Sequence, residues 1–341
     1  MPLRFLPRLV NDPYDDPGLF VPFQFARRAL LFDLGDNARL SPRDLLKTSH
    51  VFVTHTHMDH FVGFDRLLRC CLGREKELFL FGPPGFIGNV EGKLAGYTWD
   101  LVERFSACLR LHLTEVRPEG RVQCVFECRR RFQPGPVTAA PPAEGPLHAE
   151  PEFQVSAALL RHSTPCLGFA LTERFGVNFL KTEMAALGLT PGPWLSRFKA
   201  ALYAGADPGE VIDTPPGPGG GSRRFSLGEL SGRIARITAG QKIAYVTDVY
   251  DCPENRAAII ALARDADHLF IEAAFLDREC ELAAAKHHLT AGQAGEIAAL
   301  AAAKRFTLFH FSPRYEGREA EILAEAQQAY EETGGGKRSN E

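Results

Sequence analysis

Three histidines and one aspartate crowd into six positions, directly behind a run of β-branched and aromatic residues that reads VFVTHTHMDH from 51 to 60. Because side chains two residues apart on an extended segment point the same way, His55 and His57 can bind one metal ion. The chain must then turn, which brings Asp59 and His60 round from the turn into a following helix, where they can bind a second ion. A satisfied polar edge of a sheet is the alternative, but packing gives no reason for four ligand-type side chains in so short a loop.

A site for two metal ions needs more ligands, and the sequence offers them at the ends of later predicted strands. They are His162 in LLRHSTP, Asp248 in AYVTDVY and His310 in LFHFSPRY. One ion would then have three histidines and the other two histidines and an aspartate, with Asp248 bridging both. The sequence therefore predicts a dinuclear centre built from His55, His57, Asp59, His60, His162, Asp248 and His310.

These side chains must be positioned by buried strands that alternate with helices. Short apolar runs rich in Val, Phe and Leu and bounded by turn residues predict strands, and helical spacing of apolar residues predicts helices. Alternation of the two is typical of an α/β fold. The predicted strands are 28–36, 49–57, 77–85, 154–163, 242–250, 268–275 and 305–312, and the predicted helices are 65–77, 290–305 and 316–332.

Composition places the chain among ordinary globular proteins. It has 341 residues, of which 45% are hydrophobic, enough to bury a large core as one α/β domain or two smaller ones. The net charge of -3 argues against a protein that coats nucleic acid non-specifically. A local basic patch could still bind RNA.

The cysteines and the N-terminus predict a cytoplasmic protein without a membrane partner. The eight cysteines are scattered and form no C-x-x-C pair, which is typical of reduced thiols in a reducing compartment. We find no signal-peptide pattern in MPLRFLPRLVNDPYDDPG and no apolar run of about 18 residues anywhere in the chain.

Proline and glycine mark three irregular segments, at 133–151, 213–224 and 334–341. Their density forbids regular elements, so we interpret them as loops or insertions and not as domain linkers. The prediction is one domain over 1–333, with an arm or lid inserted at about 173–240, and a flexible tail over 334–341.

The H-x-H-x-D-H motif, followed by an isolated histidine, an aspartate and a final histidine at strand ends, resembles the metallo-β-lactamase fold. Within that fold it resembles ribonuclease Z, the family of tRNA 3′-end processing endonucleases. LLFDLGD, GLTPGPWLSRFK, IEAAF, HHLTA and HFSPRY extend the resemblance over roughly 28–315. The chain departs from the family pattern in four places: FLPRLVNDP replaces a glycine-rich opening, HTHMDH replaces H-L-H-G-D-H, Thr247, Asp248 and Val249 replace Gly-Asp-Thr, and Ile271 replaces a histidine. The resemblance implies an αββα sandwich of two mixed sheets packed face to face, with helices outside and the site at one edge.

The resemblance also implies chemistry. Two zinc ions can share a bridging water and lower its pKa to about 7, which makes hydroxide available to attack phosphorus at neutral pH. Asp59 would orient the hydroxide or take its proton, and His288 would stabilise developing charge or protonate the leaving oxygen, supported by Glu272. His287 is the competing candidate for each role given to His288. The remaining histidines His50, His112, His148 and His268 are expected to be structural or surface residues.

Two partners follow from the resemblance, precursor tRNA and a second copy of the chain. In ribonuclease Z the stretch that corresponds to 173–240 is an arm that grips tRNA, and basic plus aromatic residues suit phosphate contact and base stacking. A lid over the site is the alternative. For the homodimer, the alanines of helix 290–305 offer a surface for close packing. The arm residues in question are Arg174, Phe175, Phe179, Lys181, Trp194, Arg197, Phe198, Lys199, Arg223 and Arg224.

Three functions therefore compete. The first is a zinc-dependent endoribonuclease that removes the 3′ trailer of precursor tRNA. The second is a hydrolase of small phosphodiesters or other esters on the same dinuclear zinc site, because one fold hosts many substrates. The third is a non-enzymatic nucleic-acid-binding module, which would have no physical reason to keep all seven ligands.

Overall fold

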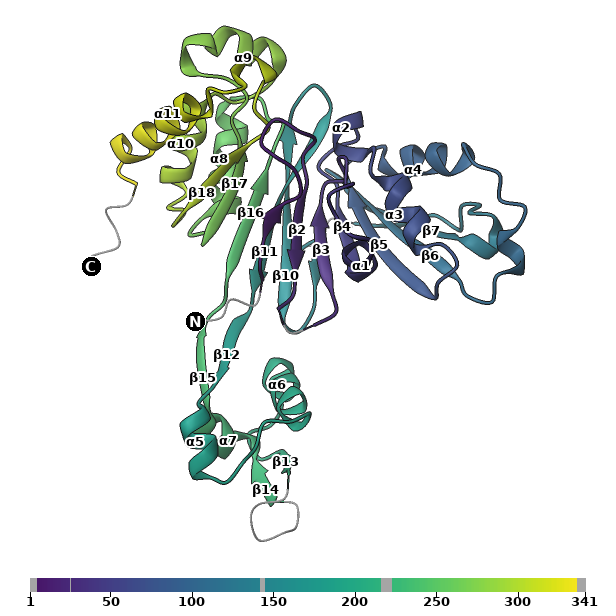
Figure 1. Ribbon diagram of the computed structural model, residues 1–341, viewed down its shortest axis with the longest axis vertical. Coiled ribbons are helices and arrows are strands. Elements are labelled where there is room, and N and C mark those ends of the chain that lie inside the picture. The colour runs from purple at the N-terminus through teal and green to yellow at the C-terminus, as the bar shows by residue number, and fades with distance from the viewer. Residues whose placement is uncertain (1–4, 25, 142–144, 216–222, 336–341) are drawn as a thin grey trace. The chain divides into compact units, whose positions relative to one another are not determined.

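The computed structural model describes residues 5–24, 26–141, 145–215 and 223–335 (Figure 1). Parts of the loops predicted at 133–151 and 213–224, and most of the predicted tail, lie outside the described residues. Contacts divide the chain into two compact units. The first contains Met1–Gly145, Ser156–Ala170 and Lys242–Glu341, and the second contains Pro146–Val155 and Leu171–Gln241.

The first sheet has eight strands whose spatial order follows the sequence, from β1 to β8. The middle strands β3 to β6 run parallel, and helices α1 to α4 lie in the crossovers that parallel neighbours require. The strands are β1 (Arg8–Leu9), β2 (Leu19–Pro22), β3 (Ala29–Phe32), β4 (Thr48–Phe52), β5 (Lys76–Gly82), β6 (Leu109–Arg117), β7 (Gly120–Glu127) and β8 (Thr138–Ala140). The helices are α1 (Pro42–Lys47), α2 (Met58–Phe61), α3 (Phe64–Cys71) and α4 (Phe86–Ala95).

The second sheet has six strands in the order β18-β17-β16-β11-β10-β9. Its strands β16, β17 and β18 are parallel and are connected by helices. The strands are β9 (His148–Ala149), β10 (Phe153–Arg161), β11 (Pro165–Glu173), β16 (Lys242–Val246), β17 (His268–Glu272) and β18 (Phe306–Phe309). The helices are α8 (Pro253–Ala263), α9 (Cys280–Lys286), α10 (Ala291–Leu300) and α11 (Glu319–Glu332), and short 3₁₀ helices occur at Val102–Arg104, Cys128–Arg130, Asp277–Glu279 and Pro313–Tyr315.

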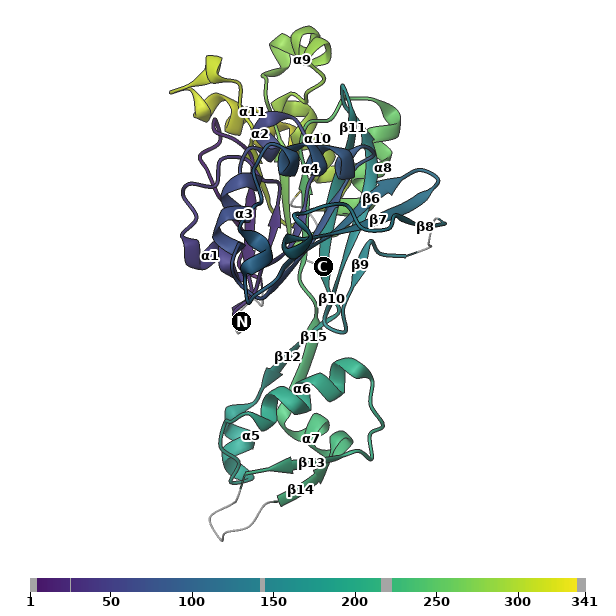
Figure 2. The same ribbon diagram turned by 90° about the vertical axis from the view of Figure 1, so that its right-hand side faces the viewer.

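The two sheets pack face to face through aromatic rings. The ring centroid of Phe169 on β11 lies 5.9 Å from that of Phe32 on β3 and 5.5 Å from that of Phe52 on β4. Alternate residues such as Val51 point to the other face of the first sheet, into the core beneath α1, α3 and α4. A corresponding core lies beneath α8, α10 and α11 on the second sheet, so helices cover both outer faces (Figures 1 and 2). The predicted αββα sandwich is confirmed.

The second unit has a small core of its own. Trp194 and Phe198 are 2% and 0% exposed within it, because both rings pack among aliphatic side chains such as Leu230. The expectation that these two aromatic rings suit base stacking is therefore wrong. The elements of this unit are β12 (Phe175–Phe179) paired with β15 (Ala235–Ala239), β13 (Val211–Thr214) paired with β14 (Arg223–Ser226), and α5 (Lys181–Ala186), α6 (Trp194–Ala204) and α7 (Leu227–Ile234).

The alanine face of α10 packs inside the chain. Ala294 and Ala298 are fully buried, and a Cβ added at Gly295 would lie 2.1 Å from the carbonyl oxygen of Ala326 on α11. The small residues thus let α10 and α11 approach each other closely. The prediction that these alanines contact a second copy of the chain is wrong, because they are buried in the chain's own core. Over the described residues, none of the helices is both long enough and apolar enough to cross a membrane.

Candidate metal centre

The loop after β4 presents the H-x-H-x-D-H motif at the end of the parallel strands. His57 keeps an extended backbone (φ -61°, ψ 157°) as the N-cap of the four-residue helix α2, and this helix turns Asp59 and His60 toward the same region as His55. His55 Nε2 and His57 Nδ1 lie 2.9 Å apart. The predicted turn into a helix therefore occurs within the motif itself.

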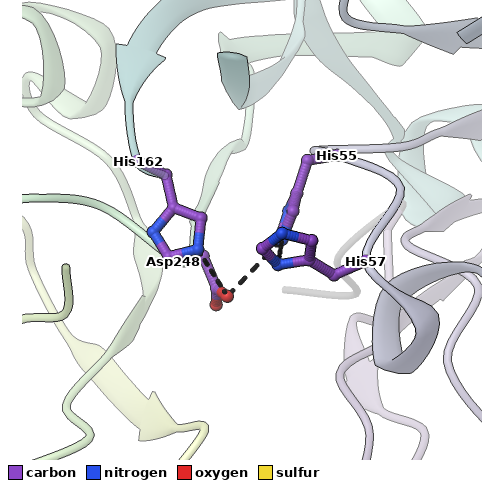
Figure 3. A group of neighbouring side chains, drawn as sticks. All are labelled: His55, His57, His162 and Asp248. Carbon is purple, nitrogen blue, oxygen red and sulfur yellow. Dashed lines mark hydrogen bonds and ion pairs between the residues drawn. The ribbon is translucent and has the colours of Figure 1, made fainter. Parts of the chain in front are cut away.

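Three histidines and one aspartate form the first group of ligand-type atoms. His55, His57, His162 and Asp248 each offer an atom within 4.8 Å of the others, and they surround one point in Figure 3. Asp248 Oδ2 lies 3.5 Å from His55 Nε2 and 3.6 Å from His162 Nε2. These residues come from the motif loop, from the end of β10 and from the end of β16.

The second group of ligand-type atoms also lies beside Asp248. Asp59, His60 and His310 also offer atoms within 4.8 Å of one another. Asp248 Oδ2 lies 3.4 Å from His60 Nε2, and Asp248 Oδ1 lies 3.5 Å from His310 Nδ1. The structure thus brings all seven predicted residues together, with Asp248 within 3.6 Å of histidines from both groups.

Two buried imidazole nitrogens in this region have no hydrogen-bonding partner among the described residues, His60 Nε2 and His310 Nδ1. A buried polar atom without a partner is costly, and binding of a water or an ion is one way to satisfy such an atom. Both nitrogens face carboxylate oxygens that lie too far away for good hydrogen bonds. The donor set and these two nitrogens fit divalent metal ions of the kind that histidine and carboxylate ligands bind.

The protonation states of His55, Asp59 and Asp248 suit metal binding, whereas nearby carboxylates raise the pKa of His60 and His310 against the effect of burial. Burial, together with the positive charge of nearby His60, lowers the pKa of His55 to about 2, so its imidazole is neutral at physiological pH. Burial alone would raise the pKa of Asp59, but the hydrogen bond with His310 and the positive charges of His60 and His310 outweigh it and lower that pKa. Burial opposes ionisation of Asp248 too, yet the surrounding histidines hold its pKa well below the usual value. A neutral imidazole and ionised carboxylates are the forms that ligate metals.

A buried carboxylate that the sequence did not identify, Asp33, holds His60. Its Oδ2 lies 2.9 Å from His60 Nδ1 and accepts hydrogen bonds from the hydroxyls of Thr54 and Tyr245, each at 3.0 Å. The backbone N–H of Thr54 donates to Oδ1 at 2.7 Å. Because the Asp33 carboxylate accepts a hydrogen bond from His60 Nδ1, the Nε2 atom of His60 faces the site. Carboxylate–histidine pairs orient metal ligands in this way. In the sequence, the one sign that Asp33 has a role is its position directly after the apolar run of LLFDLGD.

His287 and His288 have different positions. The backbone carbonyl of His287 accepts from His162 Nδ1 at 3.0 Å, which leaves His162 Nε2 for the site, while the His287 ring lies 5.5 Å from that of Tyr250. His288 Nδ1 lies 2.7 Å from Glu272 Oε2, and the His288 ring lies 5.3 Å from that of His310. Burial would lower the pKa of His288, but the charge and hydrogen bond of Glu272 raise it to about 9. His288 is therefore a charged donor beside the centre.

Glu272 is anchored from a second direction as well. Its Oε1 accepts from the backbone N–H of Val249 at 2.7 Å, next to Asp248. The carboxylate is completely buried and links the end of β17 to the segment that carries Asp248. Glu272 can therefore fix the position of His288 relative to the seven candidate ligands.

Three functional residues at strand ends have left-handed backbone conformations. The φ angle is 58° at Asp33, 51° at Asp248 and 61° at His310. Non-glycine residues rarely adopt positive φ, although aspartate and histidine do so more often than most. The conformation turns each side chain out of the strand direction and into the region between the sheets.

Comparison with known proteins agrees with this geometry. Residues 163–311 match the model of the beta-lactamase superfamily domain. The chain is 34% identical over 327 residues to "Ribonuclease Z" of Deinococcus radiodurans, an alignment that covers 94% of each chain. It is 31% identical over 314 residues to "Ribonuclease Z" of Geobacillus kaustophilus, with 89% of this chain and 84% of that protein covered.

Solved structures share the fold at low sequence identity. The metallo-beta-lactamase fold protein YhfI from Bacillus subtilis superposes with a TM-score of 0.52 at 15% identity, over 95% of this chain and 92% of the other. A long form RNase Z from yeast superposes with a TM-score of 0.51 at 14% identity, over 91% of this chain but 37% of the larger yeast chain. The fold, the sequence similarity to relatives over nearly the whole chain, and the histidines at the strand ends all indicate the same family. The chain belongs to the ribonuclease Z family.

Proposed function

We propose that this chain is a metal-dependent endoribonuclease that removes the 3′ trailer of precursor tRNA. The observation that carries the proposal is the convergence of seven histidine and aspartate side chains about Asp248, in a member of the ribonuclease Z family. The site would hold two zinc ions. His55, His57 and His162 would bind one ion, Asp59, His60 and His310 would bind the other, and Asp248 would bridge them.

Zinc, when bound, would supply a water of lowered pKa and positive charge for the phosphate oxygens. The chain's own residues then have separate tasks. Asp59 Oδ2 lies 3.4 Å from both His60 Nε2 and His310 Nε2, among the residues that would hold the second ion, and its carboxylate would orient the attacking water or accept its proton. His288 can donate a proton or a hydrogen bond to the leaving oxygen, while Glu272 holds the ring in place.

Exposed basic side chains of the second unit support a nucleic-acid substrate. Lys181 and Arg197 are exposed, and the structure gives neither an acidic partner among the described residues. Such side chains can contact phosphates without reading sequence. We therefore propose that the segment at about 173–240 is an inserted arm that binds tRNA through its charges and not through its two buried rings.

The alternative is hydrolysis of small phosphodiesters, and the burial of Trp194 and Phe198 favours it, because the arm then lacks two of its expected stacking rings. The deciding experiment incubates zinc-loaded protein with a precursor tRNA that carries a 3′ trailer and, separately, with a chromogenic phosphodiester. We expect trailer removal that leaves a 3′-hydroxyl on the tRNA. A His57→Ala variant controls for contaminating nuclease. Cleavage of the chromogenic diester alone would refute the tRNA substrate and support the alternative.

A homodimer and a cytoplasmic location complete the proposal. The family resemblance supports the dimer, whereas the alanines of α10 do not, because they pack within the chain. The cytoplasmic location agrees with the eight cysteines, all of which are free thiols.

A further inference from the structure

A cleft lies along helices α1 and α3, on the outer face of the first sheet (Figures 1 and 2). Its volume is about 530 Å³, in the range of small-ligand sites, and none of the seven candidate ligands lines it. We call it the basic groove, because three arginines line it. Its lining includes Leu46 of α1, Arg66, Arg69 and Cys70 of α3, and Arg74, which follows that helix.

The positive charge of these arginines is not neutralised within the described part of the chain. The described lining contains no aspartate or glutamate, and none of the three guanidinium groups forms an ion pair there. The Arg66 guanidinium donates to the backbone carbonyl oxygens of Asn37 and Leu40, the latter at 2.9 Å. Arg74 Nε donates to the carbonyl oxygen of Cys70 at 3.3 Å. Carbonyl oxygens satisfy N–H donors without cancelling the charge, so the groove favours an anion.

The acidic side chains near these arginines in sequence pair with cations that do not line the groove. The pairs are Asp44 with Lys47 at 3.0 Å, Asp65 with Lys93 at 2.9 Å, and Glu75 with Arg110 at 3.2 Å. Lys76 adds a further cation, because its Nζ donates to the carbonyl oxygen of Leu46 at 2.9 Å and has no carboxylate partner among the described residues. The groove therefore concentrates positive charge in a chain whose net charge is -3.

Helix capping explains only part of this arrangement. Cations near the C-terminal end of a helix interact favourably with its dipole, which accounts for Arg69 and for the contact of Arg74 with the helix end. Arg66, however, lies in the first turn of α3, where the same dipole disfavours a positive charge. Burial also lowers the pKa of Lys76, the direction expected for an ammonium group without a nearby carboxylate. A bound anion would stabilise both Arg66 and Lys76.

We propose that the basic groove binds phosphate groups of an RNA backbone, a contact made by neither the candidate centre nor the segment at 173–240. Arg66 and Arg69 are three positions apart and so lie on one side of α3, a helix of eight residues that is about 12 Å long. Cations spread over that length suit successive phosphates of one strand better than a single small anion. Such contacts position RNA without reading its sequence. The choice of RNA rests on the proposed function, whereas phosphate recognition follows from the groove.

The first measurement compares affinities for mature tRNA, which carries no trailer to be removed. Fluorescence anisotropy with labelled tRNA and the zinc-loaded chain gives Kd at several salt concentrations. Arg69 is exposed, so Arg69→Gln removes one phosphate contact without disturbing the core. We expect Kd to rise about threefold to tenfold at low salt, and the slope of log K against log salt to become shallower by about one.

Arg305→Gln is the matched control. Arg305 is exposed, has no ion pair among the described residues and does not line the groove. Its replacement should leave Kd within about twofold of the parent value. No binding of tRNA by the parent, or an equal loss of affinity in the two variants, would overturn the proposal.

Cys70 reports on the groove directly, because its thiol is partly exposed whereas that of its neighbour Cys71 is buried. Saturating tRNA should slow alkylation of Cys70 by iodoacetamide several-fold, measured by mass spectrometry of its peptide, with the rate in the absence of RNA as the reference. An unchanged rate would overturn the proposal. Slowing by millimolar inorganic phosphate but not by tRNA would assign the groove to the free ion and overturn the RNA occupant.

Two further outcomes of the alkylation experiment are distinct. Slowing that increases with protein concentration in the absence of RNA would assign the groove to a contact between chains and overturn the proposal. Because neither measurement requires cleavage, failure of the proposed function is recognised separately. A chain that binds tRNA and protects Cys70, but leaves the 3′ trailer of precursor tRNA intact, would refute the nuclease and retain the phosphate-binding groove.

Discussion

His288 lies against Glu272 and beside the seven candidate ligands without completing either group of three. Replacing it by alanine should leave about two zinc ions per chain and lower turnover roughly a hundredfold, the usual scale for a lost general acid or electrostatic stabiliser. Metal analysis and steady-state kinetics on the same preparation measure both quantities. His57→Ala should instead lose metal and activity together.

His287→Ala is the natural comparison for that experiment. The contact of His287 with His162 is made by its backbone carbonyl, which alanine retains. We therefore expect a much smaller loss of turnover than for His288→Ala. If His288→Ala lost zinc as His57→Ala does, or if His287→Ala were the slower of the two variants, the catalytic histidine would be misassigned.

His268 should make the protein sensitive to acid. Burial, helped by the charge of Arg305, lowers its pKa to about 4, and its Nδ1 has no acceptor among the described residues. Because the folded pKa is below the ordinary value, the contribution to stability is complete above about pH 6.5 and is lost as the pH falls toward 4. For metal-free His268→Gln, the decrease in free energy of unfolding between pH 7 and pH 4 should be smaller than for the parent, by on the order of 2 kcal/mol. Denaturant titrations measure this difference, and identical decreases would contradict it.

The segment that ends helix α10 contains an alanine in a backbone conformation that alanine does not favour. The N–H of Ala303 bonds to the carbonyl of Ala298, and Ala302 between them has φ 52°, a position that glycine usually occupies. Ala302→Gly should therefore stabilise the protein by about 1 kcal/mol. Ala299→Gly, inside the same helix, should destabilise it by a similar amount. Denaturation midpoints of the two variants test this, and a loss of stability in both would contradict it.

The strands that carry the ligands were predictable, but some of the elements around them were not. The seven ligand candidates were recognisable because histidine and aspartate followed apolar runs at strand ends, a local signal. β11 was not predicted: it begins at Pro165, and although it follows its neighbour β10 directly in sequence, its other neighbour in the sheet, β16, is distant in sequence. Asp33 was missed because its partner Tyr245 is 212 positions away. The aromatic residues at about 173–240 could not show from sequence alone whether their rings form a small core or an exposed surface for base stacking.

At the scale of the whole molecule, the number of chains in the assembly can be measured directly. The chain mass is 37.6 kDa, so light scattering at micromolar concentration should give about twice that value if the proposed dimer forms. The exposed side chains of Leu300 and Leu323 are the apolar positions of α10 and α11 that a partner could cover. A single species with the monomer mass would contradict the dimer.

The left-handed backbone at Asp33, Asp248 and His310 has a consequence for how this protein would evolve. At Asp248 and His310 the conformation costs free energy that glycine would avoid, so selection for folding alone would remove these two side chains, whereas Asp33 would be kept by the hydrogen bonds that it accepts from Thr54 and Tyr245. A library selected only for heat resistance, with no demand for activity, should accumulate glycine or asparagine at the first two positions. The strand ends would then be the first places where such a lineage loses its chemistry while it keeps its fold.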